Sequence, residues 1–434
     1  MNKSYNNSIN SKTKRILVIS WFFPPINSSE GLVTYKLLKN SSLNYDVFCQ
    51  NSNSSWSYGE DKEFPNCSNI NTIYSNANNL NDWKTEAIDF FNKNHENYDI
   101  VMTRSMPPES HDVGLAIKQK FPKIKWIASF GDPIANNPYT FFNNADLSPY
   151  SLKIRYIRHM SIWEMLSPIR ALKNIVWHVR YKKNLKIFNP KETKVQDKIL
   201  TLCDLIIFNN RFQEKYMIKN EKYSEKSLVL AHSFDSSLYK NNNNRNSKKI
   251  KMVYIGHLDN IRSPRLLLEA IKSLKSKKKD LSKKLEVNFY GNISKEDKKF
   301  IKENNIKDIV VLKENVSYLE SLAIMKNADW LIHIDANISN FVDDNIFFAA
   351  KLADYIGSDT PIFGITMLSG ASYEILNNMN AVITTFSASN IENYLYLILY
   401  ENYNTVMDTK RKEEFNAITI AKKFDIAIKN LKDK

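Results

Sequence analysis

Glycine and cysteine are both scarce in this 434-residue sequence, which contains nine glycines and three cysteines. The cysteines have neither the spacing of a metal site nor that of a redox pair, so we expect reduced thiols. The sequence also lacks the GxGxxG dinucleotide fingerprint, the GxxxxGK[ST] phosphate loop and the HExxH zinc motif. These absences argue against the common dinucleotide-binding, P-loop and zinc-protease classes.

Long apolar runs are absent as well. No stretch approaches the roughly 18 apolar residues that a membrane-spanning helix requires. The run 16–23 follows basic residues and so mimics a secretory signal, but it ends at Pro24 and has no small-residue cleavage site. We interpret it as a buried first strand, and we expect residues 1–14 to be a disordered tail in a cytoplasmic protein.

Short runs rich in Ile, Val and Phe alternate with amphipathic segments through most of the chain. Because these runs are continuous rather than alternating, they are typical of strands buried on both faces of a parallel sheet. The sequence therefore predicts an α/β fold with parallel sheets. The predicted strands are 15–20, 45–49, 98–103, 124–129, 204–208 and 227–231, followed by 251–255, 285–290, 309–312, 329–334, 361–365 and 381–385.

The length suits two domains of about 200 residues each. A polar, Asn-rich segment at 239–249 breaks the pattern, and the strand–helix alternation restarts after it. We therefore predict an N-terminal Rossmann-like domain at 15–238, a linker at 239–249 and a C-terminal Rossmann-like domain at 250–410. A final helical segment at 411–434 is expected to pack back on the first domain.

Several of the few glycines lie at or soon after the ends of predicted strands. They are Gly31, Gly131, Gly256, Gly291 and Gly364. Ligands of open α/β sheets bind outside the carboxyl ends of the strands, where the backbone approaches phosphate closely. One such glycine is explained by a turn alone, but several at equivalent edges favour a ligand cleft between the two domains.

Two segments of the second half carry charged residues suited to a nucleotide diphosphate. In the first, a strand ends at Gly256 and Arg262 lies before the helical pattern that starts at Arg265. In the second, Lys351 and Asp354 lie three residues apart and therefore on one helical face. Cations and helix N-termini suit phosphate, and a carboxylate suits ribose hydroxyls. The alternative is an exposed helical salt bridge between Lys351 and Asp354, worth a few tenths of a kcal/mol.

These two segments resemble the carboxyl domain of family 4 glycosyltransferases of the GT-B fold. The resemblance implies that Asp354 holds the nucleotide ribose, as the second acid of the family's E-x7-E motif, and that Arg262 binds the diphosphate. Two positions depart from the family pattern. Ile346 stands where the first acid is usual. His257 stands at another arginine position, and we expect it, like Gly256, to lie at the donor site.

The resemblance implies a hexosyltransferase-type enzyme that moves a sugar from a nucleotide diphosphate sugar to a hydroxyl, with retention of configuration. A lipid-linked acceptor or a growing surface polysaccharide is expected. The cation pair and helix N-termini would neutralise the leaving diphosphate. We expect no cofactor and no metal, because the Asp-x-Asp pair of the single-domain transferases is also missing.

The first half contributes three further candidates. Gly31 opens the helix after the first strand and is expected to offer backbone N–H groups to phosphate. His111 follows the strand at 98–103 and would contact the sugar or relay a proton, although a helix cap or a packed side chain explains it equally. Asp132 would bind a sugar or acceptor hydroxyl, and an Asx-turn before Pro133 is the alternative.

The predicted insertion at 151–190 is strongly basic, with aromatic residues interleaved, in a chain of net charge +15. This composition favours an anionic membrane surface, which would place the enzyme peripherally on the cytoplasmic face of the membrane. The same composition is compatible with nucleic acid or with an ordinary solvated helix. Two other functions stay open: a GT-B-fold sugar-nucleotide 2-epimerase and a non-enzymatic nucleic-acid-binding protein. For the transferase we expect no nucleic-acid partner.

Overall fold

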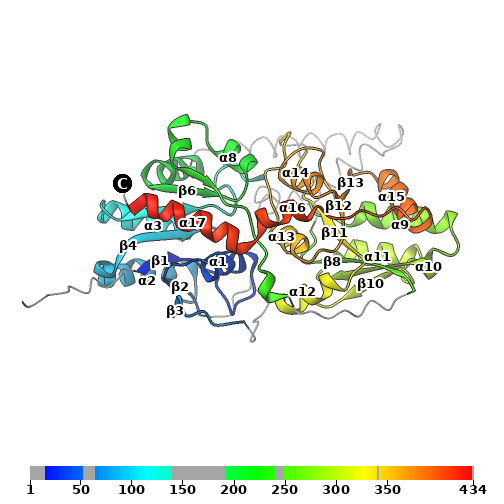
Figure 1. The fold of residues 1–434 in the computed structure, drawn as a ribbon, viewed down its shortest axis with the longest axis horizontal. Coiled ribbons are helices and arrows are strands. Elements are labelled where there is room, and N and C mark those ends of the chain that lie inside the picture. Colours follow the sequence, from blue (N-terminus) through cyan, green and yellow to red (C-terminus); the bar gives the residue numbers. More distant parts are fainter. Residues whose placement is uncertain are drawn as a thin grey trace, which may run out of the picture.

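The computed structural model describes residues 15–51, 64–138, 191–239, 248–259, 261–339 and 342–432, so the basic segment 151–190 lies outside the described residues. The described chain forms two α/β units side by side, each built on a parallel sheet (Figure 1). The first sheet has seven strands in the order β3-β2-β1-β4-β5-β6-β7. Its strands are β1 (Arg15–Ile19), β2 (Tyr45–Gln50), β3 (Ile70–Ser75), β4 (Tyr98–Arg104), β5 (Lys125–Ser129), β6 (Leu205–Phe208) and β7 (Ser227–Val229).

The second sheet has six parallel strands in the order β10-β9-β8-β11-β12-β13. The chain changes direction of winding at β8, as it does at β1 in the first sheet, which is the doubly wound arrangement of nucleotide-binding folds. The strands are β8 (Ile250–Ile255), β9 (Leu285–Tyr290), β10 (Val310–Lys313), β11 (Trp330–Ile334), β12 (Ile362–Ile365) and β13 (Val382–Thr384).

Helices precede or follow the strands of both sheets. In the first unit they are α1 (Ser29–Lys39), α2 (Leu80–Asn94), α3 (Glu109–Lys120) and α8 (Arg211–Met217). In the second they are α9 (Arg265–Lys277), α10 (Leu281–Lys284), α11 (Lys295–Glu303), α12 (Tyr318–Lys326), α13 (Ala350–Gly357), α14 (Ala371–Asn378), α15 (Ala388–Tyr400) and α16 (Thr409–Lys412). Helix α17 (Ala417–Lys432) follows.

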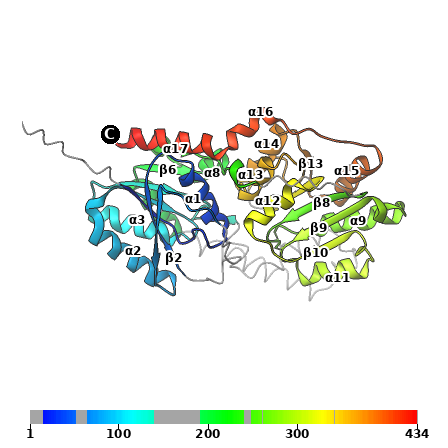
Figure 2. The ribbon, with the colours of Figure 1, turned by 60° about the horizontal axis from the view of Figure 1, so that its bottom comes forward.

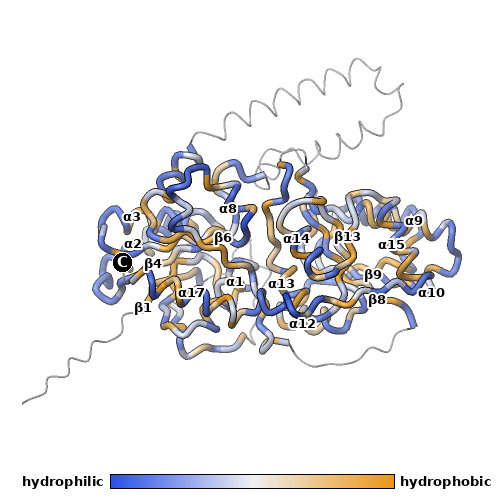
Figure 3. The backbone as a smooth tube through the Cα atoms, turned by 45° about the horizontal axis from the view of Figure 1, so that its top comes forward, coloured by the Kyte–Doolittle hydropathy of each residue, from blue (hydrophilic) through white to orange (hydrophobic). Residues whose placement is uncertain are grey.

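Both faces of the first sheet are covered, and β1 shows why its run is continuously apolar. Ile16 and Val18 pack in one core with α1 and α17, whereas Leu17 and Ile19 pack in another with α2 and α3. Successive side chains of a strand point to opposite faces, so a strand covered on both sides must be apolar at every position. In Figure 3, where the backbone is coloured by residue hydropathy, hydrophobic residues lie in the interior of each unit.

The prediction of a two-sheet, parallel α/β architecture is confirmed, and each of the twelve predicted strands has a counterpart. The sequence did not predict β3, which is an edge strand with a largely half-exposed or exposed pattern. Gly364 is the penultimate residue of β12, at the end of the strand as expected, and its missing Cβ leaves room for Leu376.

Helix α17 returns from the second unit to the first (Figure 2). Where the chain enters α17, it forms two backbone hydrogen bonds with Phe234. Phe234 N–H donates to the Phe415 carbonyl, and Ala417 N–H donates to the Phe234 carbonyl. Beyond that point, Phe424 and Ile428 are buried in the core that also contains β1 and β2. The described residues contain no helix that is long and apolar enough to cross a membrane.

Candidate functional site

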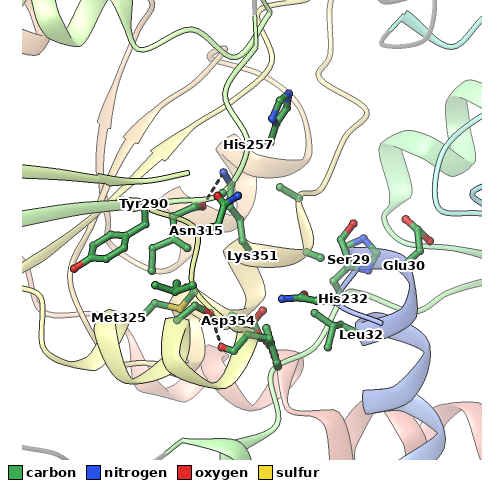
Figure 4. Close-up of a pocket in the computed structure, with 18 of the residues that line it drawn as sticks. Ser29, Glu30, Leu32, His232, His257, Tyr290, Asn315, Met325, Lys351 and Asp354 are labelled. Carbon is green, nitrogen blue, oxygen red and sulfur yellow. Dashed lines mark hydrogen bonds between the residues drawn. The ribbon is translucent and has the colours of Figure 1, made fainter. Parts of the chain in front are cut away.

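A cavity of about 390 Å³ is lined by residues of both units. In Figure 4, Ser29 and Glu30 of α1 lie on one side of it, and Lys351 and Asp354 of α13 lie on the other. Six of the eight predicted site residues line it: Asp132, Gly256, His257, Arg262, Lys351 and Asp354. The two others, Gly31 and His111, are not part of the lining.

Two glycines form the turns at the ends of β8 and β9, and the first of them, Gly256, lines the cavity. Gly256 and Gly291 both have positive φ, +120° and +131°, a conformation that favours glycine. A Cβ on Gly291 would lie 2.4 Å from the carbonyl oxygen of Gly256, which is impossible without moving the backbone. A Cβ on Gly256 would lie 3.4 Å from Lys351 Nζ. The two turns therefore pack against each other, and the absence of a side chain on both glycines allows this close approach.

Lys351 reaches this space from the first turn of α13. Its Nζ lies 3.9 Å from the ring centroid of Tyr254, and it donates to Tyr254 Oη and to the Ile255 carbonyl. Burial holds the pKa of Lys351 well below its usual value, and the nearby Arg262 guanidinium lowers it further. A bound dianion would favour the charged ammonium, so this lysine is suited to a phosphate ligand.

Arg262 is held by the turn that precedes α9. The backbone N–H groups of Ile261 and Arg262 donate to Asp259 Oδ1 over 2.9 and 2.7 Å, so the loop has the form of an Asx-turn. The Arg262 side chain lines the cavity together with Lys351. Two cations therefore face the same space, an arrangement that suits a diphosphate.

Asp354 is buried on α13 and contacts residues from two other elements. Its Oδ1 accepts hydrogen bonds from Lys36 Nζ of α1, over 2.8 Å, and from Tyr318 Oη of α12, over 2.9 Å. Burial raises the pKa of Asp354, and Lys36 is the main influence that lowers it. The alternative explanation, an exposed salt bridge between Lys351 and Asp354, does not hold, because both side chains have other partners.

Asp132 lies on the first-unit side of the cavity together with Glu30. Burial raises the pKa of Asp132 to about 7, and the neighbouring Glu30 carboxylate contributes, while Arg104 and Arg262 oppose the shift. Glu30 is ion-paired with Arg104 over 2.8 Å. Its carboxylate occupies the space where a Cβ on Gly131 would be, 2.7 Å away. The cavity thus carries two neighbouring carboxyl groups opposite the cation pair.

His111 lies apart from this group. It is fully buried in α3, its Nδ1 is 2.7 Å from Thr103 Oγ1, and its ring packs on Phe130. Burial, with a smaller effect of Arg104, lowers the pKa of His111 to about 3. This geometry favours the packed side chain over the proton relay.

Gly31 also has a structural explanation. Its N–H donates to Ser28 Oγ, the cap of α1, over 3.1 Å. A Cβ at this position would lie 3.1 Å from the backbone of Phe22 and Phe23. The glycine therefore permits α1 to approach the loop after β1, and the same helix carries Glu30 and Lys36, which line the cavity.

The position of the family's first acid stays apolar. Ile346 is buried, and its carbonyl accepts a hydrogen bond from Asn210 Nδ2 over 2.9 Å. The two neighbouring acids, Asp343 and Asp344, do not line the cavity, and Asp344 accepts from Ser369 Oγ. His257 lines the cavity with an exposed side chain. The described residues contain no group of three His, Cys, Asp or Glu side chains that could hold a metal ion.

Sequence reasoning missed three polar residues of the site: Lys36, Tyr318 and the ion-paired Glu30. Lys36 and Tyr318 lie at helical positions that no motif marks, and they meet Asp354 only through the tertiary fold. Glu30 stands directly before Gly31 at the start of the helix that follows the first strand. A charged residue beside a glycine that the sequence singles out is the one signal that could have identified it.

No family model matches the chain, and no curated protein matches it in sequence. Solved structures are similar in fold. Sucrose-phosphate synthase from Thermosynechococcus elongatus has a TM-score of 0.66 at 12% identity, over 97% of this chain and 99% of that chain. Anabaena HepE, solved with UDP-glucose, has a TM-score of 0.62 at 12% identity, over 97% and 100%.

A putative UDP-N-acetylglucosamine 2-epimerase from Listeria monocytogenes is also similar, with a TM-score of 0.55 at 10% identity over 97% of each chain. The shared architecture is two parallel α/β units of seven and six strands. The chain therefore has the GT-B fold, as the sequence predicted.

Proposed function

We propose that the chain is a nucleotide-sugar-dependent glycosyltransferase whose donor binds in the cavity between the two units. The observation that carries this proposal is the meeting of Gly256, Arg262, Lys351 and Asp354 in one cavity, although they come from separate segments. Arg262 and Lys351 would bind the diphosphate, and Asp354 would bind the ribose. Asp132 would lie near the transferred sugar or the acceptor hydroxyl.

The electrostatics of the cavity support this assignment. The leaving group of the reaction is a nucleoside diphosphate, whose negative charge grows as the glycosidic bond breaks. Two fixed cations stabilise that charge most where water is excluded. Burial lowers the pKa of Lys351, and the negative charge of a bound diphosphate would raise it again, so the donor favours the charged ammonium.

A thermal-shift screen against UDP-, GDP-, ADP- and dTDP-sugars tests the proposal, because a specific donor stabilises the fold by mass action. Arg262→Ala and Lys351→Ala should each weaken the best donor by roughly tenfold to a hundredfold, since hydrogen bonds to charged groups contribute about 1.5–3 kcal/mol. Arg211→Ala is a matched control, because Arg211 pairs with Glu374 on the surface. Unchanged donor affinity in both site variants would remove this site.

A sugar-nucleotide 2-epimerase is the second candidate, and the carboxyl pair formed by Glu30 and Asp132 favours it. That reaction needs acid and base groups beside the sugar and no acceptor. The two candidates differ in their products. Incubation of the donor without an acceptor should leave the sugar unchanged for a transferase, whereas an epimerase would yield the 2-epimer or free nucleoside diphosphate.

We further propose a hexose donor, a lipid-linked or surface-polysaccharide acceptor, retention of configuration, and attachment to the cytoplasmic membrane face. The attachment depends on the basic segment 151–190. Charge reversal across 170–186 should release the protein from vesicles that contain anionic lipid, while zwitterionic vesicles serve as the control. Equal binding of the reversed and unchanged proteins would contradict the membrane proposal.

A further inference from the structure

The cluster of Lys36, Asp354 and Tyr318 joins the two units at the cavity. Lys36 belongs to α1 of the first unit, whereas Asp354 and Tyr318 belong to α13 and α12 of the second. Both donors contact the same carboxylate oxygen, Asp354 Oδ1, at 2.8 and 2.9 Å. The side chains of Lys36 and Asp354 are only 1% and 6% exposed, so this is a buried ion pair across the interface.

The energetics of such a pair point away from a purely stabilising role. Burying two charges costs about as much as their attraction returns, and apolar residues of similar size often serve equally well. The neighbours of Lys36 on α1, including Tyr35, Leu37 and Leu38, are buried and mostly apolar. A lysine at this position therefore needs a reason beyond packing, and the partner that it reaches is the acid assigned to the ribose.

The carboxylate keeps one oxygen for a ligand. Among the described residues, the hydrogen bonds to the Asp354 side chain all fall on Oδ1. Lys36, Tyr318 and Asp354 all line the cavity. A carboxylate that is fixed and charged through one oxygen can accept hydroxyl hydrogens through the other, and charge-assisted hydrogen bonds of this kind are about twice as strong as neutral ones.

We propose that Lys36 is a positioning residue for ribose recognition: it holds Asp354 ionised and in place, so that the first unit makes the ribose site of the second unit complete. This inference rests on the proposed nucleotide-sugar function and adds a residue that does not itself need to touch the donor. Ribose selectivity then depends on the contact between the two units.

The test compares binding of UDP with binding of 2′,3′-dideoxy-UDP by titration calorimetry, with the ADP and GDP pairs measured alongside. Lys36→Met keeps a long side chain and removes the charge. It should weaken the ribose-containing nucleotide by about tenfold, because a charge-assisted contact is lost, and leave the dideoxy analogue unchanged. Asp354→Asn should have the same effect, and the double variant should lose no more than either single one.

The pH dependence gives a second measurement. Without Lys36, burial keeps the Asp354 pKa raised, so the carboxyl is protonated at low pH and ionises as the pH rises. The ribose preference of Lys36→Met should therefore return only at a higher pH than that of the unchanged protein, in which Lys36 lowers the Asp354 pKa and the nearby Asp235 carboxylate raises it. Lys118→Met is the matched control, because Lys118 pairs with Asp204 in the first unit and neither residue lines the cavity.

Each outcome is decisive. If Lys36→Met weakens both nucleotides of a pair equally, or neither, the positioning role is wrong while the donor site stands. If the unchanged protein binds none of the three nucleoside diphosphates, the proposed function fails and this inference fails with it. Circular dichroism and thermal unfolding of each variant show whether the fold is retained.

Discussion

Asp132 and Glu30 bring two carboxyl groups to the same side of the cavity, and their coupling can be measured. If Asp132 accepts a proton during turnover, kcat/KM should rise as this group ionises, with an inflection near pH 7, the value to which burial and Glu30 raise its pKa. Glu30→Gln removes the neighbouring negative charge, so the inflection should move to lower pH. Asp132→Asn should abolish it.

The control for this prediction is Asp112→Asn. Asp112 pairs with Lys84 on the surface of α3, and its side chain is 44% exposed. Its removal should leave the profile of kcat/KM against pH unchanged. An inflection near pH 7 that persists in Asp132→Asn would show that another group titrates, and the catalytic assignment of Asp132 would be withdrawn.

His111 makes the stability of the protein depend on pH, because burial lowers its pKa to about 3. Below about pH 6.5 the unfolded chain takes up a proton that the folded protein does not accept, so stability is lost as the pH falls, by about 1.4 kcal/mol per pH unit. His111→Asn removes this dependence. Its free energy of unfolding should approach that of the unchanged protein between pH 6.5 and pH 4.5.

Urea unfolding at a series of pH values measures this convergence. Turnover and donor affinity of His111→Asn should stay close to normal wherever the variant is folded, because the side chain is outside the cavity lining. A large loss of kcat with unchanged stability would instead restore the proton-relay interpretation of His111.

At the level of single residues, the sequence predicted site residues best where a charged side chain or a glycine lies at the end of a strand or the start of a helix. Gly256, Arg262, Lys351 and Asp354 were chosen because they follow strands or open helices, and strand ends meet at one edge of a sheet. Lys36 could not be chosen in this way, since its partner is 318 residues away. Its pattern on α1 is that of a buried helix face, and only the docking of the two units shows why it is charged.

The elements were largely predictable because a strand buried on both faces leaves a clear apolar run. β3 is the one strand that the sequence did not predict. Its sequence, INTIYS, belongs to an edge strand with polar and half-exposed positions. Edge strands need no continuous apolar run, so their signal is weak. The missed element lies away from the cavity lining, and the site prediction was unaffected.

The turns after β8 and β9 pack against each other, and a substitution in the second turn tests this contact without changing a residue that lines the cavity. Gly291 is outside the cavity lining, but a Cβ there would lie 2.4 Å from the Gly256 carbonyl oxygen, and its φ is +131°. Gly291→Ala should therefore displace the Gly256 turn. We expect a loss of stability of about 1–3 kcal/mol from the backbone strain and a clear loss of donor affinity.

Gly114→Ala provides the comparison for Gly291→Ala. A Cβ on Gly114 would also clash, at 2.4 Å from the Trp126 ring, but this contact lies in the interior of the first unit. It should lower the midpoint of thermal unfolding while leaving donor affinity nearly unchanged at temperatures where the variant is folded. If both variants lose donor affinity alike, the effect is general destabilisation rather than a displaced turn.

At the scale of the whole molecule, α17 makes the first unit depend on the last part of the chain. Phe424 is fully buried in the core formed with β1, β2 and α1. Phe424→Ala should lower the free energy of unfolding by about 3–5 kcal/mol, since it removes a large buried side chain and leaves a cavity. Donor affinity should change little at temperatures where the protein is folded, because the residue is outside the ligand cavity.

Ile426→Ala is the control on the same helix, because Ile426 is 61% exposed and its loss should cost little. Urea unfolding and calorimetric titration of both variants measure the two effects separately. Phe424→Ala also tests whether the ribose site of the second unit depends on the core of the first, since Lys36 of α1 contacts Asp354 across the interface. If Phe424→Ala loosens α1 as well, the ribose preference should fall with stability. If the preference holds while stability falls, α1 is held at the cavity by the second unit itself.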